Sequence, residues 1–192
     1  MAPTRERILI TAAELFRRQG YAGTGLKQVT TQAEAPFGSL YHFWPGGKEQ
    51  LGEEVIRTGG AFFLALYRAI ADEAPDLPTA IGDFFTGAGE TLVATDYLDA
   101  CPIATVAGEV ASTHEPLRAA SAGVFESWLA ALSDDLEGAG IPEPRARPIA
   151  LALVAGLEGA FLLCRTLRST EPMDAARAAA LTVLHAELEP AP

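Results

Sequence analysis

Apolar side chains recur every three or four residues along most of this 192-residue chain. Near the N-terminus the pattern runs through Ile8, Ala12 and Leu15, and a later stretch repeats it at Ile81 and Phe85. Residues at this spacing share one face of an α-helix, so the pattern predicts amphipathic helices. The sequence offers no alternating strand pattern of useful length. The chain is therefore predicted to be all-α.

Glycines and prolines divide the periodic stretches, because proline is tolerated in the first turn of a helix and glycine commonly ends one. Thr24 is the predicted N-cap of the second helix. Gly59-Gly60 lies inside the fourth helix, where each glycine costs about 1 kcal/mol and serves either close packing or a hinge. The predicted helices cover approximately residues 8–19, 26–33, 36–44, 48–74, 78–95, 102–112, 116–137, 145–169 and 173–188.

The composition is that of an ordinary globular protein, with 49% hydrophobic and 20% charged residues. Cys101 and Cys164 are too few to indicate a disulfide framework. Each is a small buried apolar residue, a thiol that lines a pocket or a redox sensor. The charged, periodic N-terminus does not resemble a secretory signal. The longest apolar run, 149–164, contains Glu158 and is shorter than the roughly 20 residues of a membrane span. We therefore expect a cytoplasmic protein without a membrane span.

The net charge of −11 is unevenly distributed. Residues 1–57 contain seven basic and six acidic side chains, so the remainder has a formal charge of −12. Charge interactions across solvent are screened beyond about 8–10 Å. The acidic remainder therefore need not prevent the first 57 residues from approaching a nucleic acid.

Residues 35–51, APFGSLYHFWPGGKEQL, combine a short helix with a Pro-Gly-Gly break and a lysine at the start of the next helix. Leu40, Phe43 and Trp44 can face a small core, which leaves the other polar and aromatic residues of this helix pointing outward. Together with the preceding helix, this is helix-turn-helix geometry, in which the second helix enters the major groove of DNA. The helix start at Lys48 offers free N–H groups and a cation to a phosphate.

The sequence contains no recognisable catalytic or metal-binding set. Its histidines, His42, His114 and His185, are scattered and lack the spacing of metal ligands. The nucleophile-elbow motif GxSxG, the P-loop and the GxGxxG motif are absent from the sequence. We predict no enzyme activity, no metal and no cofactor.

Most of residues 5–57 resemble the TetR/AcrR family of bacterial transcriptional regulators. The resemblance is based on the first helix from Ile8 to Phe16, the segment from Gly20 to Thr24, and the run GSLYHFWP followed by KEQL. The PGGKEQL variant and Cys101-Pro102-Ile103 are similar to the LmrA/YxaF-type subgroup.

The resemblance implies a DNA-binding domain at 1–57, built as a three-helix helix-turn-helix bundle, and a larger helical domain at 58–192 for ligand binding and dimerisation. It also implies that Thr24 touches phosphate and that Lys48 clamps the DNA backbone. Three departures concern the base contacts: Glu34 stands where a turn glycine is common, Pro36-Phe37 replace more polar residues, and Gly46-Gly47 lengthens the loop. Phenylalanine can still contact a thymine methyl group. The implied DNA-binding residues are Thr24, Lys27, Phe37, Gly38, Ser39, Tyr41, His42 and Lys48.

The C-terminal helices carry more apolar surface than one monomer core needs. The helix at 145–169 is apolar nearly all round and the helix at 173–188 is alanine-rich. Pairing both with their twofold mates would form a four-helix bundle, whereas a larger monomeric core is the alternative. Glu158 is predicted either to pair with Arg165 across the dimer or to fix a ligand.

A small-molecule pocket is expected among the central helices, because such sites are apolar cavities with a few polar groups. Glu109 would either favour a cationic or hydrogen-bonding ligand or face water. The candidate lining residues are Phe62, Phe63, Leu66, Phe84, Phe85, Leu92, Thr105, Glu109, Phe125 and Trp128.

The sequence thus predicts a homodimeric repressor that binds operator DNA and is released by a small-molecule effector. The alternative is a small-molecule binding or scavenging protein whose N-terminal bundle does not read DNA.

Overall fold

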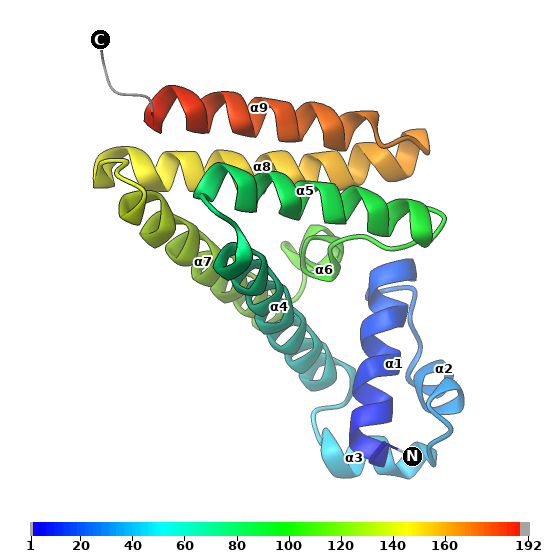
Figure 1. The fold of residues 1–192 in the computed structure, drawn as a ribbon. Helices are drawn as coiled ribbons and strands as arrows, with labels where there is room; N and C mark the ends of the chain where they lie inside the picture. Colours follow the sequence, from blue (N-terminus) through cyan, green and yellow to red (C-terminus); the bar gives the residue numbers. More distant parts are fainter. Residues whose placement is uncertain (1, 189–192) are drawn as a thin grey trace. The chain divides into compact units, whose positions relative to one another are not determined.

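The structure, a computed structural model, describes residues 2–188. Every regular element among these residues is a helix, which confirms the predicted all-α class (Figure 1). The helices are α1 (Thr4–Gln19), α2 (Leu26–Gln32), α3 (Phe37–Phe43), α4 (Gly47–Glu73), α5 (Leu77–Ala94), α6 (Pro102–Val110), α7 (Glu115–Gly138), α8 (Glu143–Leu167) and α9 (Glu171–Leu188).

The chain forms two compact units that do not follow a single cut in the sequence. The first unit contains residues 1–62 together with 101–125, and the second contains 63–100 together with 126–192. Helices α4 and α7 therefore each contribute to both units. The division into a DNA-binding domain and a C-terminal domain at residue 57 stays a prediction. Residues 101–125, which follow that boundary, pack with residues 1–62.

The first unit is built around α1, α3 and the start of α4. Ile8, Phe16, Leu40 and Leu51 are fully buried there. At Gly60, an added Cβ atom would lie only 2.4 Å from Cγ1 of Val124. The absence of a side chain at Gly60 thus lets α4 and α7 approach closely, so this glycine serves packing rather than a hinge.

The second unit is dominated by α5, α8 and α9, which pack against one another; α8 and α9 lie side by side in Figure 1. Asp76 caps α5 by accepting a hydrogen bond from the Thr79 N–H at 2.8 Å. Deeper in the unit, the Tyr67 hydroxyl donates to Asp135 at 2.7 Å. Burial raises the pKa of Tyr67, and the hydrogen bond to Asp135 adds to the effect. The core of this unit includes Ile81, Phe85, Leu92, Leu136, Ile149, Leu153, Ala160, Cys164, Met173 and Leu184.

Helix α8 keeps part of its apolar surface exposed. Leu162 is 67% exposed and Leu167 is 62% exposed. By length and composition alone this 25-residue helix could cross a membrane, although only 28% of its most apolar window is buried. A single helix of this kind is weak evidence for a membrane span, because buried helices of soluble proteins have the same composition.

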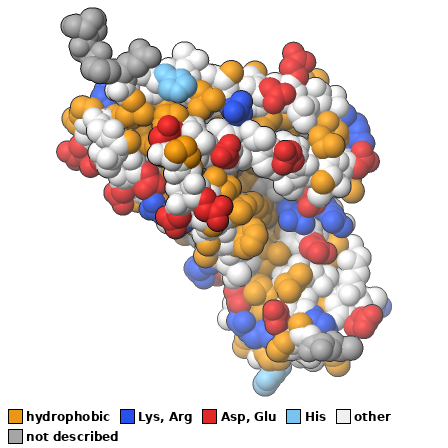
Figure 2. Space-filling view, in the orientation of Figure 1, with side chains coloured by type: hydrophobic (Ala, Val, Ile, Leu, Met, Phe, Trp, Pro, Cys, Tyr) orange, Lys and Arg blue, Asp and Glu red, His pale blue; other side chains and the backbone are white. Residues whose placement is uncertain are grey.

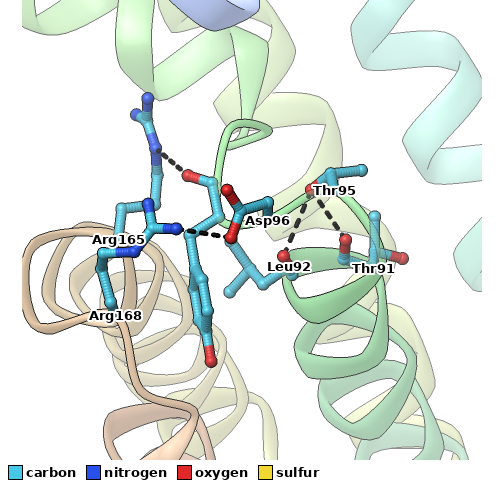
Figure 3. A network of polar contacts seen from close by, with 7 residues as sticks. Thr91, Leu92, Thr95, Asp96, Arg165 and Arg168 are labelled. Atoms are coloured by element: carbon cyan, nitrogen blue, oxygen red, sulfur yellow. Dashed lines mark hydrogen bonds and ion pairs between the residues drawn. The ribbon is translucent and has the colours of Figure 1, made fainter.

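A polar network ties the end of α5 to the end of α8 (Figure 3). Asp96 and Tyr97 both have left-handed backbone conformations, with φ of 50° and 58°. Arg165 donates from Nε to the Tyr97 carbonyl at 3.3 Å, and Arg168 forms an ion pair with the Asp96 carboxylate. Arg165 thus has a partner within its own chain, while the predicted pairing with Glu158 across a dimer stays untested.

Both cysteines are buried free thiols, as expected for small apolar residues. Burial raises the pKa of the Cys164 thiol. The Cys101 sulfur accepts the Ala104 N–H at the start of α6, with a donor–acceptor distance of 3.5 Å.

Candidate nucleic-acid interface

The turn between α2 and α3 is fixed by an arginine from α1. Glu34 adopts a left-handed conformation with φ of 49°, the position where the sequence departs from a common glycine. Arg7 donates from Nε to the Ala33 carbonyl at 2.9 Å and from Nη2 to the Glu34 carbonyl at 3.1 Å. These bonds occupy carbonyls that follow the last turn of α2, where intrahelical donors are lacking. Pro36 then precedes α3 as its N-cap residue.

One face of α3 is anchored in the first unit. Leu40 and Trp44 are fully buried, as predicted, and Phe43 is partly buried. The Trp44 indole donates to Glu54 at 2.7 Å, and Arg5 donates to both oxygens of the same carboxylate at 2.6 and 2.7 Å. Glu54 therefore holds the end of α3 and the start of α1 on α4, which fixes the direction of the short helix.

The opposite face of α3 is open to solvent. Phe37 is 49% exposed and Tyr41 is 48% exposed, and their rings meet edge to face with centroids 5.8 Å apart. Gly38 and His42 are also exposed, and Ser39 is partly exposed. The outward orientation predicted for these residues agrees with the structure. Two exposed aromatic rings on a single turn of helix form a surface suited to contact with a partner.

Lys48 lies in the first turn of α4, after Gly47, whose φ of 65° favours glycine. Its ammonium group is 4.4 Å from the centroid of the Tyr21 ring. Partial burial lowers the pKa of Lys48, and the negative charge of Glu109 opposes that shift. The Gly46 N–H at the same helix start is bound by the Gln50 side chain at 2.9 Å.

The predicted capping role of Thr24 is wrong. Gly25 is the N-cap residue of α2, and no side chain caps that helix. The Thr24 side chain is buried, and its hydroxyl donates to the Gly20 carbonyl at 2.8 Å while accepting from Gln19 at 3.1 Å. Because its hydroxyl binds the Gly20 carbonyl, Thr24 stabilises the loop between α1 and α2 rather than capping α2. Lys27, by contrast, is exposed in the first turn of α2.

The two units differ in formal charge. The first unit contains eight basic and eight acidic side chains, so its formal charges cancel. The second contains six basic and seventeen acidic side chains. On the face drawn in Figure 2, acidic side chains are spread over helices of the second unit. A polyanion is therefore repelled less by the first unit than by the second.

The residues predicted to line a ligand pocket are divided between the units. Phe85 and Leu92 are buried in the core of the second unit. In the same unit Phe63 contacts Trp128, with ring centroids 6.4 Å apart. Leu66 and Phe84 also belong to the second unit, whereas Phe62, Thr105, Glu109 and Phe125 belong to the first.

Glu109 lies against the loop between α1 and α2. Its carboxylate accepts the Ala22 N–H at 2.8 Å, across 87 residues of sequence. This contact was not anticipated from the sequence, because no local pattern links two residues so far apart. Thr105, on the same helix, donates to the Cys101 carbonyl at 2.9 Å.

Comparison with known proteins supports the role indicated by this geometry. Residues 8–55 match the family model described as bacterial regulatory proteins of the tetR family. Residues 78–179 match the model described as transcriptional regulator LmrA/YxaF-like, C-terminal domain.

Relatives match over most of their length. The HTH-type transcriptional regulator YxaF of Bacillus subtilis is 35% identical over 170 residues, covering 88% of this chain and 89% of that protein. The regulator LmrA of the same organism is 32% identical, with 88% and 90% covered. The HTH-type transcriptional repressor DhaR of Mycobacterium sp. is 27% identical over 182 residues, with 90% and 87% covered.

Solved structures share the fold. A TetR transcriptional regulator from Legionella pneumophila superposes with a TM-score of 0.85 at 22% identity, covering 95% of this chain and 98% of that one. The relatives are regulators by name, which agrees with the prediction that the chain is not an enzyme. The α3 surface and these matches together assign the chain to the TetR family of DNA-binding transcriptional regulators, with a C-terminal domain of the LmrA/YxaF-like group.

Proposed function

We propose that this protein is a homodimeric repressor that binds operator DNA through α3 and dissociates when a small molecule binds its second unit. The observation that carries the proposal is the division of α3 into a buried face, held by Leu40 and Trp44, and an exposed face that includes Phe37 and Tyr41. A short helix fixed in this way can enter a major groove without changing its orientation.

The exposed residues divide into two classes of DNA contact. Ser39, with Phe37 and Gly38, lies near the start of α3, the end that approaches base edges in a helix-turn-helix protein. Tyr41, His42, Lys27 and Lys48 would bind phosphates or the groove edge. Thr24 would act indirectly, because its hydroxyl is already used within the loop.

Dimerisation is supported by the exposed apolar surface of α8. Leu162, Leu163 and Leu167 are at least half exposed in the single chain. A second copy of α8 and α9 would remove these side chains from water, which favours association by about 25 cal/mol per Å² of apolar area. A dimer also presents two copies of α3 to successive turns of the duplex.

The effector site is proposed around the partly buried side chains of the second unit. Phe63, Phe84 and Trp128 provide aromatic surface, and Leu66 is 41% exposed. Phe85 and Leu92 belong to the packed core and are less suited to line a site. An effector that binds the DNA-incompetent form more tightly would shift the population away from operator binding.

A mobility-shift assay on DNA selected from a random pool tests the proposal. Tyr41→Ala and Lys48→Ala are expected to weaken binding to all sequences, by about tenfold or more if each removes one charge-assisted or phosphate contact. Ser39→Ala is expected to change the selected sequence more than the affinity. Asp72→Ala, at an exposed position of α4 in the second unit, is the control and should leave both unchanged.

The proposal fails if the wild-type protein shows no salt-sensitive, sequence-specific shift. Binding of small molecules without any selected DNA would instead favour a scavenging protein. Equal effects of the Ser39, Tyr41 and Lys48 variants on affinity and on sequence preference would contradict the division of contacts.

A further inference from the structure

We infer that Glu109 is a positioning residue for operator binding: through the Ala22 N–H it fixes the loop between α1 and α2 on which the Lys48 side chain rests. The inference builds on the proposed function, since it takes Lys48 as a phosphate contact. It assigns Glu109 to the DNA-binding machinery rather than to the wall of an effector pocket.

The first observation is the hydrogen bond itself. The Glu109 carboxylate accepts the backbone N–H of Ala22 at 2.8 Å. Both residues belong to the first unit, in which α6 packs against α1. A carboxylate that accepts an N–H bonds more strongly than a neutral acceptor does. One side chain of α6 therefore holds a loop that precedes it by more than eighty residues.

The second observation is how closely the carboxylate covers the loop. Gly20 ends α1 with φ of 81°, and an added Cβ atom would lie 1.8 Å from Oε1 of Glu109. The backbone conformation favours glycine at position 20, and a side chain there would displace the Glu109 carboxylate from the loop.

The third observation connects the loop to Lys48. Tyr21, between Gly20 and Ala22, is buried, with ring centroids 5.4 Å from Phe16 and 5.5 Å from His114. The Lys48 ammonium lies 4.4 Å from the centroid of the same ring. A displacement of Ala22 would move Tyr21 and remove the support beneath Lys48.

The glutamate has two opposing effects on DNA binding, and they can be separated. Its acceptor oxygen orders the loop, which favours binding. Its negative charge acts on Lys48 and competes with a phosphate for that ammonium group. Glutamine removes the charge and keeps an acceptor oxygen, whereas alanine removes both.

The test compares Glu109→Gln and Glu109→Ala in the full-length protein, using the DNA selected by the wild type at one fixed salt concentration. The alanine variant is expected to bind about fivefold more weakly than the glutamine variant, the effect of losing one hydrogen bond to a neutral acceptor. Glu115→Ala is the charge-matched control, because Glu115 is exposed in the same unit and pairs with Arg118. The Glu115→Ala variant should bind the selected DNA with the same affinity as the wild type.

Amide hydrogen exchange gives a second readout that a general loss of stability would not reproduce. Exchange at Ala22 should accelerate about tenfold in Glu109→Ala and remain near the wild-type rate in Glu109→Gln and Glu115→Ala. Equal operator affinity of the two Glu109 variants, with wild-type binding intact, overturns the inference alone. A wild-type protein that selects no DNA overturns the proposed function and the inference with it.

Discussion

At the scale of single residues, Glu34 shows how the helix-turn-helix turn is made without its common glycine. The residue is left-handed, a conformation that costs about 1–2 kcal/mol for a residue with a Cβ atom. Arg7 binds the Ala33 and Glu34 carbonyls, and neither bond uses the Glu34 side chain. Because Arg7 of α1 holds these backbone carbonyls, the turn can keep its conformation with a residue other than glycine at position 34.

This predicts a particular order of stability at position 34. Glu34→Gly should leave the free energy of unfolding unchanged or raise it by up to about 1 kcal/mol, because relief of strain is partly offset by the greater freedom of the unfolded chain. Glu34→Val should lower it by about 1–2 kcal/mol, since a β-branched residue resists the left-handed region. Chemical denaturation measures the free energy of unfolding of both variants. A valine variant as stable as the wild type would contradict backbone strain at position 34.

Helical spacing correctly predicts which side chains of the α3 segment point inward and which point outward. Leu40 and Trp44 point inward, and Phe37 and Tyr41 outward, as the spacing requires. The predicted N-cap role of Thr24 is wrong because a threonine hydroxyl can bind either the helix start ahead of it or a carbonyl behind it, and sequence does not decide between them.

At the scale of elements, α4 and α7 approach each other closely at Gly60 in the first unit. The Val124 methyl groups lie where a side chain would project, at 2.4 and 2.6 Å from an added Cβ atom. At Gly59 the nearest atom would be the terminal methyl group of Ile103, at 3.3 Å. Neighbouring glycines of one helix thus have different structural requirements.

Alanine substitutions should separate the two glycines. Gly60→Ala is expected to lower the free energy of unfolding by about 1–3 kcal/mol, the usual range for overpacking. Gly59→Ala should be neutral or stabilising by up to about 1 kcal/mol, because alanine favours the helix and the Ile103 side chain can move. Thermal denaturation of the two variants checks this, and equal melting temperatures would show that α4 and α7 can move apart freely.

Glycine and proline predict the helix boundaries to within a few residues. The first helix begins at Thr4, before the apolar pattern that starts at Ile8, because its first turn is polar. Helix α8 begins at Glu143 and continues through Pro148. The proline is tolerated within the helix, so its presence does not mark a boundary.

At the scale of the whole molecule, the second unit combines a strong negative charge with exposed leucines on α8. Like charge opposes association, so the apolar surface must outweigh it for a dimer to form. The sequence indicates this exposed apolar surface, because the helix predicted at 145–169 is apolar nearly all round. It did not indicate that residues 101–125 pack with the first unit, because such long-range contacts leave no periodic signal.

Leu162→Glu is expected to dissociate the proposed dimer, since it places a charge in apolar surface that would be buried. Leu98→Glu, which changes another exposed leucine outside the helices, is the matched control and should leave the dimer intact. Analytical ultracentrifugation measures the mass, and operator affinity should fall with dissociation. A Leu162→Glu protein that remains dimeric and binds operator normally would place the interface elsewhere.

Because the first unit is discontinuous in sequence, its N-terminal helices cannot be exchanged for those of another protein without losing contacts. A recombination event that joined residues 1–57 to the C-terminal domain of another family member would part Tyr21 from His114 and Ala22 from Glu109. The DNA-binding helices keep the contacts that hold them only when residues 1–62 and 101–125 are transferred together. A substitution on the exposed face of α3 leaves both contacts in place, whereas a change of the loop between α1 and α2 alters its contacts with Glu109 and His114.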